Sequence, residues 1–393
     1  MQSNYDIVLF STADWHTPYW TNKQHTAMHL AKAGYRVLYV ETVGLRQLKL
    51  GSGIDLGRLW HRLWRGLKGP RQVSERIWVL SPLVVPLKHH WSFFRRLNQN
   101  LLALYLRGFF KKECFIRPII WTYHPFILGA INRFNHAELV YHCVDDLSAM
   151  PGVDFNAFKA EEEQLLRRAD VVFTTSTTLQ EECQKISDNV HFLPNVADYD
   201  HFATSRKFAE LPAELAAIPE PRIGYIGVLS DFKVDFDLIF SIAENRPDWH
   251  WVMIGEEREG QSSPKVKQLS ELENVHFLGH RPYEKLPHYL AGMNVATLPT
   301  LINSYTASMF PMKYFEYLAA GVPVVSTPLI FTQTYESGLI VAENSSSFSD
   351  ALAQQISKGR ISEQCSKHYV GDNTWQSRLK VMLGILTSLK PNV

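Results

Sequence analysis

The fold of this chain is decided by one stretch, residues 310–327, which reads Phe-Pro-Met-Lys-Tyr-Phe-Glu-Tyr-Leu-Ala-Ala-Gly-Val-Pro-Val-Val-Ser-Thr. Its first half has the composition of a short helix, and Pro311 suits the first turn, where a missing N–H costs nothing. Gly321 suits the left-handed residue that ends a helix. Residues 322–326 are mostly β-branched, which is typical of a buried strand. The stretch therefore predicts a helix that leads directly into a strand, as in α/β sheets.

Two charges share one face of this predicted helix, because Lys313 and Glu316 are three residues apart. A cation in the first turn opposes the helix dipole by roughly 0.3–1 kcal/mol unless an anion lies beside it. A helix N-terminus with a lysine can bind phosphate, and a carboxylate one turn later can accept hydrogen bonds from a ribose diol. The alternative is an ordinary amphipathic helix with solvated charges.

Strands and helices alternate along both halves of the chain. In the first half we predict strands at 7–11, 34–40, 118–123, 138–144, 170–175 and 190–196, with helices at 24–33 and 158–168. In the second half we predict strands at 221–227, 249–254, 275–278, 295–298 and 322–326, with a helix at 236–244. This order predicts an α/β fold made of two Rossmann-like domains, with parallel sheets, that face each other across a cleft.

The 310–327 stretch resembles the donor-binding helix of the GT-B glycosyltransferases, specifically family 4 and its relatives. These enzymes commonly carry two glutamates eight residues apart, and the second binds the donor ribose. Glu316 matches the second glutamate, whereas Ser308 stands at the first position. The pair Met312-Lys313 before Glu316 is also similar to the membrane-associated glucuronosyltransferase of xanthan biosynthesis, in which the lysine lies near the donor phosphates.

The resemblance covers nearly the whole chain and implies the GT-B fold. Residues 1–197 would then form an N-terminal, acceptor-binding and membrane-facing domain, and residues 198–372 the nucleotide-sugar-binding domain. Residues 373–393 would form a C-terminal helix that crosses back to the first domain, in agreement with the helical periodicity of that segment.

Two carboxylates, Asp145 and Asp146, follow the predicted strand 138–144 at the end where ligands meet open α/β sheets. A sugar transferase needs a base for the acceptor hydroxyl, and an aspartate can serve, although either residue could instead cap the next helix. A similar tract in the xanthan-pathway enzyme carries its proposed base. The resemblance implies that Asp145 is this base and favours Asp146 as a cap. With Asp145 as base the reaction inverts; a retaining reaction, usual in family 4, needs no such base.

The acceptor-side candidates follow other predicted strands. Asp14 and His16 lie in the loop 11–18, which resembles the acceptor-side loop of these enzymes but could be a polar turn ending in proline. His124 stands where family 4 enzymes often have a histidine that touches the donor sugar, whereas a lone histidine is otherwise more often structural.

On the donor side, Gly224 and Gly227 would allow a diphosphate to approach the backbone closely. Arg281 belongs to a Gly-His-Arg-Pro element that the family places near the nucleotide base, the alternative being a surface charge. Two Asp-x-Asp patterns, at 198–200 and 235–237, resemble a metal motif of the other large transferase fold, but their places in a crossing and at a helix start argue against it. We therefore expect a metal-independent enzyme without a cofactor, in which helix dipole and basic side chains stabilise the leaving diphosphate.

The net charge of +1 conceals an uneven distribution. Residues 1–140 carry 19 Lys and Arg against 7 Asp and Glu, a net charge of +12, and the remainder carries −11. A basic half indicates a polyanionic partner, either nucleic acid or an anionic membrane. Because no helix-turn-helix, RNP, KH or zinc-finger signature is present, the membrane is favoured over nucleic acid.

Two segments supply much of this basic charge. In residues 58–68, Trp60, Leu63, Trp64 and Leu67 are spaced as one helical face with cations opposite, which predicts a helix in a lipid interface. Residues 91–112 carry an apolar stripe of Phe94, Leu97, Leu101, Leu104 and Tyr105, which predicts either a core helix or a second interfacial helix.

Cellular location follows from what the sequence lacks. The four cysteines are far apart without a CxxC pattern, which favours a reducing compartment. No signal peptide is evident at the N-terminus, and no apolar run approaches the roughly 20 residues needed to cross a bilayer. We expect a cytoplasmic protein attached peripherally to the inner face of the plasma membrane.

These observations predict a glycosyltransferase for surface polysaccharide. It would transfer a hexosyl or glucuronosyl group from a nucleotide sugar, UDP-linked by expectation, to a lipid-linked saccharide. Two alternatives remain open: a catalytically silent sugar-nucleotide-binding subunit that scaffolds a transferase complex, and a nucleotide-sugar epimerase with the same fold.

Overall fold

The computed structural model describes residues 6–17, 19–41, 69–82, 92–257 and 263–389. The chain divides into two compact units. Unit 1 comprises Met1–Leu193 and Leu379–Val393, and unit 2 comprises Pro194–Arg378. The boundaries expected from the sequence, after 197 and after 372, lie within a few residues of these.

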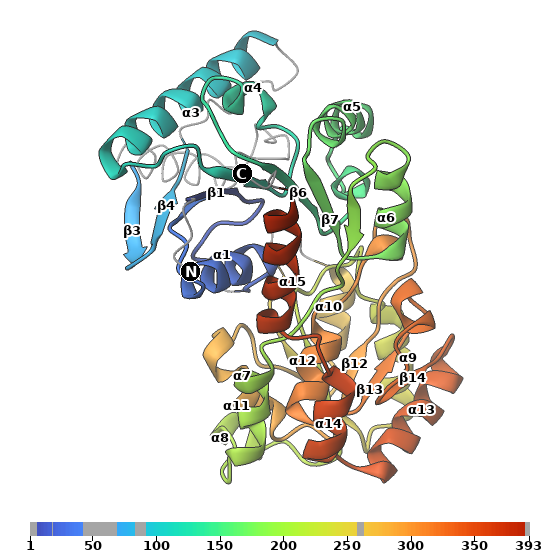
Figure 1. The fold of residues 1–393 in the computed structure, drawn as a ribbon. Helices are drawn as coiled ribbons and strands as arrows, with labels where there is room; N and C mark the ends of the chain where they lie inside the picture. Colours follow the sequence, from blue (N-terminus) through green and yellow to red (C-terminus); the bar gives the residue numbers. More distant parts are fainter. Residues whose placement is uncertain (1–5, 18, 42–68, 83–91, 258–262, 390–393) are drawn as a thin grey trace. The chain divides into compact units, whose positions relative to one another are not determined.

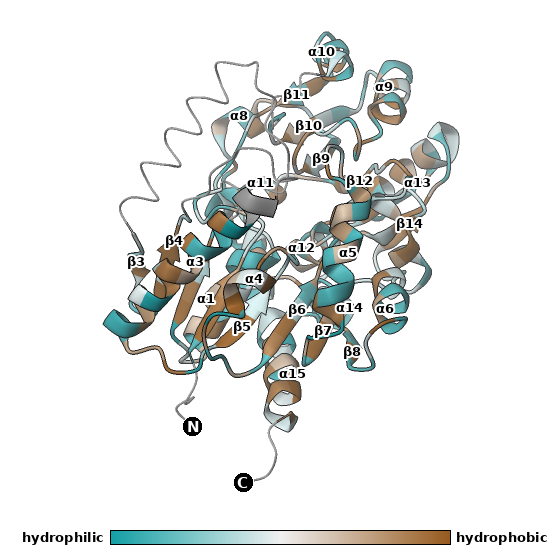
Figure 2. Ribbon diagram, turned by 90° about the horizontal axis from the view of Figure 1, so that it is seen from above, coloured by the Kyte–Doolittle hydropathy of each residue, from teal (hydrophilic) through white to brown (hydrophobic). Residues whose placement is uncertain are grey.

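An eight-stranded sheet forms the centre of unit 1 (Figure 1), in the order β3-β4-β2-β1-β5-β6-β7-β8. Its strands are β1 (Ile7–Phe10), β2 (Val37–Val40), β3 (Arg71–Ser74), β4 (Ile77–Leu80), β5 (Ile119–Thr122), β6 (Leu139–Cys143), β7 (Val171–Thr174) and β8 (Val190–Phe192). Every pair is parallel except β3 with β4. All residues of β1, β2, β5, β6 and β7 are buried, as expected for parallel strands covered on both faces, and β5–β7 are correspondingly apolar in Figure 2.

The helices of unit 1 are α1 (Asn22–Lys32), α3 (Ser92–Glu113), α4 (Leu128–Ile131), α5 (Phe155–Leu166) and α6 (Thr177–Gln184), with the 3₁₀ turn η1 (Leu147–Ala149). The chain returns to this unit through α15 (Trp375–Ser388). Leu379, Met382 and Leu386 of α15 join the same apolar core as β1 and β5. The predicted C-terminal helix that crosses back to the first domain is therefore confirmed.

Helix α3 differs from the predicted pattern. Its core-facing residues are Leu102, Ala103, Leu106 and Phe109. Leu104, a member of the predicted stripe, is instead 68% exposed. The other described members of the stripe, Leu97, Leu101 and Tyr105, are half-buried, and Tyr105 packs against the core. The helix is therefore a core helix, as one of the two alternatives predicted, and Leu104 is the member of the stripe that is exposed. The side chain of Phe94 and the whole interfacial segment 58–68 lie outside the described residues.

Unit 2 is built on a six-stranded parallel sheet in the order β11-β10-β9-β12-β13-β14. Its strands are β9 (Arg222–Ile226), β10 (His250–Ile254), β11 (Val275–Phe277), β12 (Val295–Leu298), β13 (Val324–Ser326) and β14 (Leu339–Val341). Its helices are α7 (Tyr199–Ala203), α8 (Ala213–Ala216), α9 (Phe236–Asn245), α10 (Pro264–Leu269), α11 (Leu286–Leu290), α12 (Lys313–Ala320), α13 (Ser345–Lys358) and α14 (Glu363–Val370). Short 3₁₀ turns are η2 (Thr204–Lys207), η3 (Tyr283–Lys285), η4 (Thr306–Ser308) and η5 (Ile330–Gln333).

The fold-deciding stretch forms α12 and β13. Gly321 ends the helix with a φ of 78°, as the sequence predicts, and β13 follows at Val324. Pro311 lies just before the helix rather than in its first turn, since Met312 is the N-cap and Lys313 the first helical residue. Seven of the eight residues of α12 are buried, which makes it the central helix of the unit.

Candidate active site

The strand order of unit 2 identifies where a ligand would meet its sheet. From β9 the chain first adds β10 and β11 on one side, and then β12, β13 and β14 on the other. Ligands of such doubly wound sheets bind outside the carboxyl ends of the strands, at the point where the order reverses. Here that point, called the switch point below, lies between β9 and β12. The loops that follow these two strands form the candidate site.

These two loops are hydrogen-bonded to each other. The Asp235 N–H donates to the Pro299 carbonyl over 2.8 Å, and the Leu301 N–H donates to the Lys233 carbonyl over 2.8 Å. Helix α12 is tied to the end of β9, because the Ile226 N–H donates to the Tyr317 hydroxyl over 3.0 Å. The structure thus brings Gly227, which follows β9, close to the helix that carries Lys313 and Glu316.

At the start of α12, Lys313 and Glu316 form an ion pair with an Nζ–Oε2 distance of 2.5 Å. The Glu316 side chain is 2% exposed, whereas that of Lys313 is 23% exposed. The carboxylate offsets the unfavourable position of a cation at the positive end of the helix. The result is a partly accessible ammonium group beside a buried carboxylate, as nucleotide binding would require. Met312, the N-cap, is half-buried and has no side-chain capping bond.

Lys233 was missed by the sequence reasoning. It belongs to the loop after β9, and its Nζ lies 4.8 Å from the ring centroid of Tyr305, which is in the loop after β12. A second cation therefore stands at the switch point. No local sequence signal marked Lys233, because its contact with Tyr305 joins two loops that are far apart in the sequence.

Arg281 is engaged in a cluster of its own. Its Nε donates to the Tyr289 hydroxyl over 2.6 Å, and its guanidinium pairs with Glu214 at 3.1 Å. The next residues of the segment lie nearer to α12: the pKa of the Tyr283 hydroxyl is raised by burial and by the nearby charges of Glu316, Asp198 and Glu284. The side chain of Arg281 is thus paired within this structure, and the contact of residues 279–282 with a nucleotide base stays a prediction.

This cluster predicts a pH dependence of stability. Hydrogen bonds from Tyr289, then from its own backbone and Arg281, lower the pKa of Glu214 from 4.5 to about 2. A lowered carboxyl pKa stabilises the fold above about pH 4.5, and this contribution is lost as the pH falls toward 2. Glu214→Gln should therefore lower the melting temperature at pH 7 and lower it much less at pH 2. An equal loss at both pH values would show that the charge of Glu214 is not what stabilises the cluster.

In unit 1 the strand order reverses between β1 and β5. Asp14 and His16 follow β1, His124 follows β5, and Asp145 follows the adjacent β6. The four acceptor-side and catalytic candidates therefore follow the carboxyl ends of neighbouring strands in one sheet. The loop after β1 is held by Glu41, a buried carboxylate after β2 that accepts the Trp15 N–H over 2.9 Å.

The three acceptor-side candidates differ in accessibility. His16 is exposed and Asp14 half-buried, with the Asp14 carbonyl accepting a bond from the Gln24 side chain over 3.1 Å. His124 is 1% exposed, and burial lowers its pKa to about 4, so its imidazole is neutral at pH 7. Among the described residues, Nδ1 of His124 has no hydrogen-bond partner. His124 could thus offer a neutral ring nitrogen to a hydroxyl group.

The adjacent aspartates have different surroundings. Asp146 caps η1, because its carboxylate accepts the Ser148 N–H over 3.1 Å and the Ser148 hydroxyl over 2.5 Å. Its predicted role as a cap is confirmed. The Asp145 carboxylate, 25% exposed, lies 3.8 Å from Nζ of Lys23, and it accepts no hydrogen bond from the part of the chain that the structure describes. Asp145 is thus the carboxylate with free acceptor capacity.

Helix capping also accounts for the first aspartates of the two Asp-x-Asp patterns. Asp198 accepts the His201 N–H at the start of α7, and Asp235 accepts the Leu238 N–H at the start of α9. Gly224 lies inside β9, where a Cβ would stand 3.0 Å from the Met293 sulfur, so its small size serves packing. Within the described ranges, no group of three or more His, Cys, Asp or Glu is placed to hold a metal ion.

Comparison with known proteins places this geometry in context. Residues 220–358, within unit 2, match the family model described as glycosyl transferases group 1. The whole chain superposes on sucrose-phosphate synthase from Thermosynechococcus elongatus with a TM-score of 0.72, covering 98% of this chain and 99% of that one at 16% identity. The chain has the GT-B fold.

Two further relatives are informative. Over 98% of its length, the GT-B chain described here also resembles HepE of Anabaena, solved in complex with UDP and glucose, with a TM-score of 0.64, 14% identity and 100% of that chain covered. In sequence, 229 residues are 26% identical to TuaH of Bacillus subtilis (strain 168), named as a teichuronic acid biosynthesis glycosyltransferase. That match spans 54% of this chain and about half, 56%, of the relative. The closer resemblance to the xanthan-pathway enzyme stays a prediction.

Proposed function

We propose that this protein is a group 1 glycosyltransferase of polysaccharide biosynthesis that transfers a sugar from a UDP-linked donor to a lipid-linked saccharide. The observation that carries the proposal is the start of α12, where Lys313 and the buried Glu316 lie at the switch point of a sheet within the matched residues 220–358. The UDP in the HepE structure and the role named for the Bacillus relative support the donor and the pathway class.

The donor would be held by the switch-point loops. Lys313 and the N-terminal N–H groups of α12 would bind the diphosphate, and Glu316 would accept hydrogen bonds from the ribose hydroxyls. The backbone at Gly227 would approach the diphosphate, with Lys233 as a second cation. Two cations and a helix dipole can stabilise the charge that develops on the leaving UDP, so the proposed reaction needs no metal ion.

The acceptor would be activated by Asp145. Its carboxylate takes the proton of the acceptor hydroxyl while the hydroxyl oxygen bonds to the anomeric carbon and the bond to UDP breaks. Attack from the face opposite the leaving group inverts the anomeric configuration. The open acceptor capacity of Asp145, in contrast with the capping role of Asp146, supports this assignment. Asp14, His16 and His124 would line the acceptor side.

The proposal is tested first by nucleotide binding. Calorimetry of the purified protein with UDP, ADP, GDP and CMP should give measurable binding with UDP bound most tightly. Tighter binding of ADP or GDP would mean that the donor carries that nucleotide instead of UDP. Absence of binding to all four nucleotides would contradict the assignment of α12 as the donor site.

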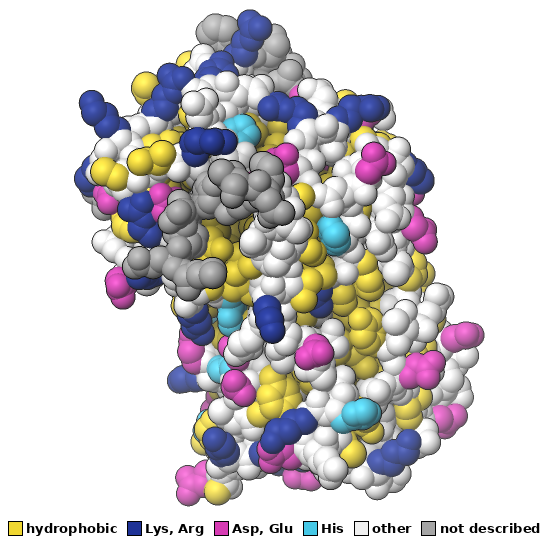
Figure 3. Space-filling model, viewed as in Figure 1, with side chains coloured by type: hydrophobic (Ala, Val, Ile, Leu, Met, Phe, Trp, Pro, Cys, Tyr) yellow, Lys and Arg dark blue, Asp and Glu magenta, His cyan; other side chains and the backbone are white. Residues whose placement is uncertain are grey.

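The outer face of α3 supports a peripheral attachment to membrane. Leu104 is 68% exposed, and Ile116, just beyond the helix, is 76% exposed. Exposed cations accompany them on the helix, namely Arg96, Arg107, Lys111 and Lys112. In Figure 3 basic and apolar side chains lie together over α3. Exposed apolar groups ringed by cations suit an anionic lipid surface. No helix in the described part of the chain is long and apolar enough to span a bilayer.

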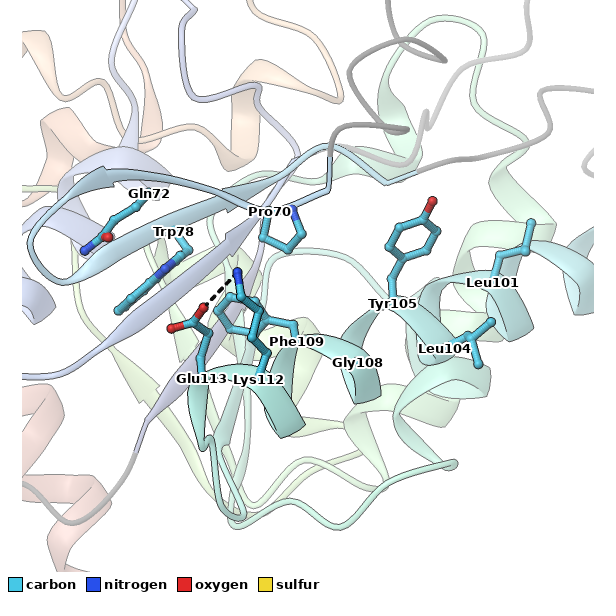
Figure 4. A pocket seen from close by; sticks show the side chains of 10 residues that line it. All are labelled: Pro70, Gln72, Trp78, Leu101, Leu104, Tyr105, Gly108, Phe109, Lys112 and Glu113. Atoms are coloured by element: carbon cyan, nitrogen blue, oxygen red, sulfur yellow. Dashed lines mark ion pairs between the residues drawn. The ribbon is translucent and has the colours of Figure 1, made fainter.

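A groove of about 640 Å³ adjoins this face and contains none of the candidate site residues. Figure 4 shows Leu101, Leu104 and Tyr105 of α3 on one side and Trp78 of the β3–β4 hairpin on the other. Lys112 and Glu113 form an ion pair of 3.4 Å at one end of the groove. An apolar groove beside exposed cations would let the α3 face admit part of an anionic lipid.

The membrane prediction is that the protein binds vesicles of phosphatidylglycerol at low salt. Each Lys or Arg near such a surface contributes about 1 kcal/mol. A triple variant with Leu104→Ser, Arg107→Ser and Lys111→Ser should sediment less with the vesicles. A second triple variant, with Ser at Trp60, Leu63 and Trp64, should do the same, and both should still bind UDP. Phe155→Ser, which removes an exposed apolar side chain of α5, is the control. A wild type that stays in the supernatant would contradict the membrane proposal.

A further inference from the structure

Lys23 is a buried cation beside the proposed base, Asp145. It is the second residue of α1 and is 6% exposed. Its Nζ lies 3.8 Å from Oδ2 of Asp145 and 5.5 Å from the ring centroid of Tyr123. Burying an ammonium group is costly unless charge or hydrogen bonds compensate, and the start of a helix adds to the cost because its dipole is positive there. A cation kept at such a place indicates a role.

The surroundings of Lys23 are rigid. Tyr123 is buried, and its hydroxyl donates to Thr26 of α1 over 2.9 Å. Burial raises the pKa of Tyr123, so this phenol is neutral and provides a ring face rather than a charge. The Asp145 carboxylate lies within ion-pair distance of Lys23. Three segments far apart in sequence meet here, from α1, β5 and β6.

The distance between the Lys23 ammonium and the Asp145 carboxylate is too long for a direct hydrogen bond. A charge-assisted hydrogen bond between an ammonium and a carboxylate spans about 2.7–2.9 Å, and the Lys23–Asp145 distance of 3.8 Å is longer. At this distance Lys23 attracts and orients the carboxylate but leaves its oxygens able to accept a proton. The neighbouring Asp146 has already used its carboxylate on Ser148.

We propose that Lys23 is a positioning residue for Asp145, an inference that rests on the proposed function. Lys23 holds the Asp145 carboxylate in position, aimed at the acceptor hydroxyl. During the reaction the hydroxyl proton moves to Asp145 and Lys23 keeps its own proton. Because Lys23 acts through Asp145 and not on the donor, its loss should affect turnover and leave donor binding intact.

The test is a double-mutant cycle on turnover. Lys23→Met should lower kcat about 10- to 100-fold with little change in the KM for the donor. Lys23→Arg should recover most of the loss, because it keeps the charge. In a protein that already carries Asp145→Asn, adding Lys23→Met should cost little more, since the group on which Lys23 acts is gone. Lys32→Met, at the exposed end of the same helix, is the matched control.

Each outcome is decisive. If Lys23→Met lowers kcat by the same factor with and without Asp145, Lys23 does not act through Asp145 and the inference is overturned; unchanged turnover in Lys23→Met overturns it as well. Should Lys23→Met alone fail to fold, two other comparisons replace it. Lys23→Arg is compared with the wild type, and the double variant, which removes both charges of the pair together, is compared with Asp145→Asn. If Asp145→Asn itself is fully active, the proposed base is wrong, which is a separate failure.

Discussion

Replacing Asp145 with Asn should lower turnover about 10²–10⁴-fold while donor affinity changes little. The amide keeps the shape of the side chain but cannot accept the proton of the acceptor hydroxyl, and positioned bases contribute a rate factor of this size. Because donor binding is assigned to the residues of unit 2, KM for the nucleotide sugar should stay close to its wild-type value. Steady-state kinetics with a saturating acceptor gives both quantities.

The matched control is Asp146→Asn. Asp146 caps η1, so its loss should cost stability of about 0.5–2 kcal/mol and much less turnover. Equal losses of turnover in both variants would mean that the wrong carboxylate has been assigned. Full activity of Asp145→Asn, with the anomeric configuration retained in the product, would indicate the retaining reaction that is usual in family 4.

Removing either charge at the start of α12 should weaken UDP binding. Glu316→Ala loses charge-assisted hydrogen bonds to ribose, worth about 1–3 kcal/mol, which corresponds to roughly 5- to 150-fold in Kd. Lys313→Ala should do comparable damage through the diphosphate. The two effects should not add, since the 2.5 Å ion pair couples the residues. Calorimetry with UDP measures both.

Fold integrity is the necessary control, because Glu316 is buried and its removal leaves Lys313 without its ion-pair partner. Circular dichroism and the melting temperature should be recorded for each variant, and Glu271→Ala, an exposed glutamate of the same unit, should bind UDP as the wild type does. Folded Glu316→Ala and Lys313→Ala variants with unchanged UDP affinity would mean that α12 is not the donor site.

The sequence predicted those elements whose burial dictates their composition. Every fully buried strand of both sheets was found, because parallel strands covered on both faces read as short apolar runs. The strands that were missed, β3, β4 and β14, lie at or next to sheet edges, and the outermost two have largely exposed or half-buried side chains. Strand β3 has no apolar run, and the apolar runs of β4 and β14 are only four and three residues long, too short to identify a strand by pattern alone.

The candidate site was predicted to a different extent in each unit. Residues within one contiguous motif, such as Lys313 with Glu316, could be proposed from their spacing alone. Lys23, Glu41 and Lys233 could not, because each becomes relevant only through a partner elsewhere in the chain: Asp145, Trp15 and Tyr305 respectively. The contacts of the Arg281 side chain with Glu214 and Tyr289 are likewise not visible in the local sequence, and its role at the donor stays a prediction.

The most direct test of the proposed function is a transfer assay. The purified protein is incubated with radiolabelled UDP-glucose, UDP-galactose, UDP-N-acetylglucosamine and UDP-glucuronic acid in turn, with a bacterial lipid extract as acceptor. We predict that with one donor the label moves to the organic phase, with one UDP released per sugar transferred, and that Asp145→Asn slows the transfer about 10²–10⁴-fold. Label that remains in the intact nucleotide sugar with every donor would favour a silent binding subunit. Conversion of a donor to its epimer would identify an epimerase, and either result would contradict the account.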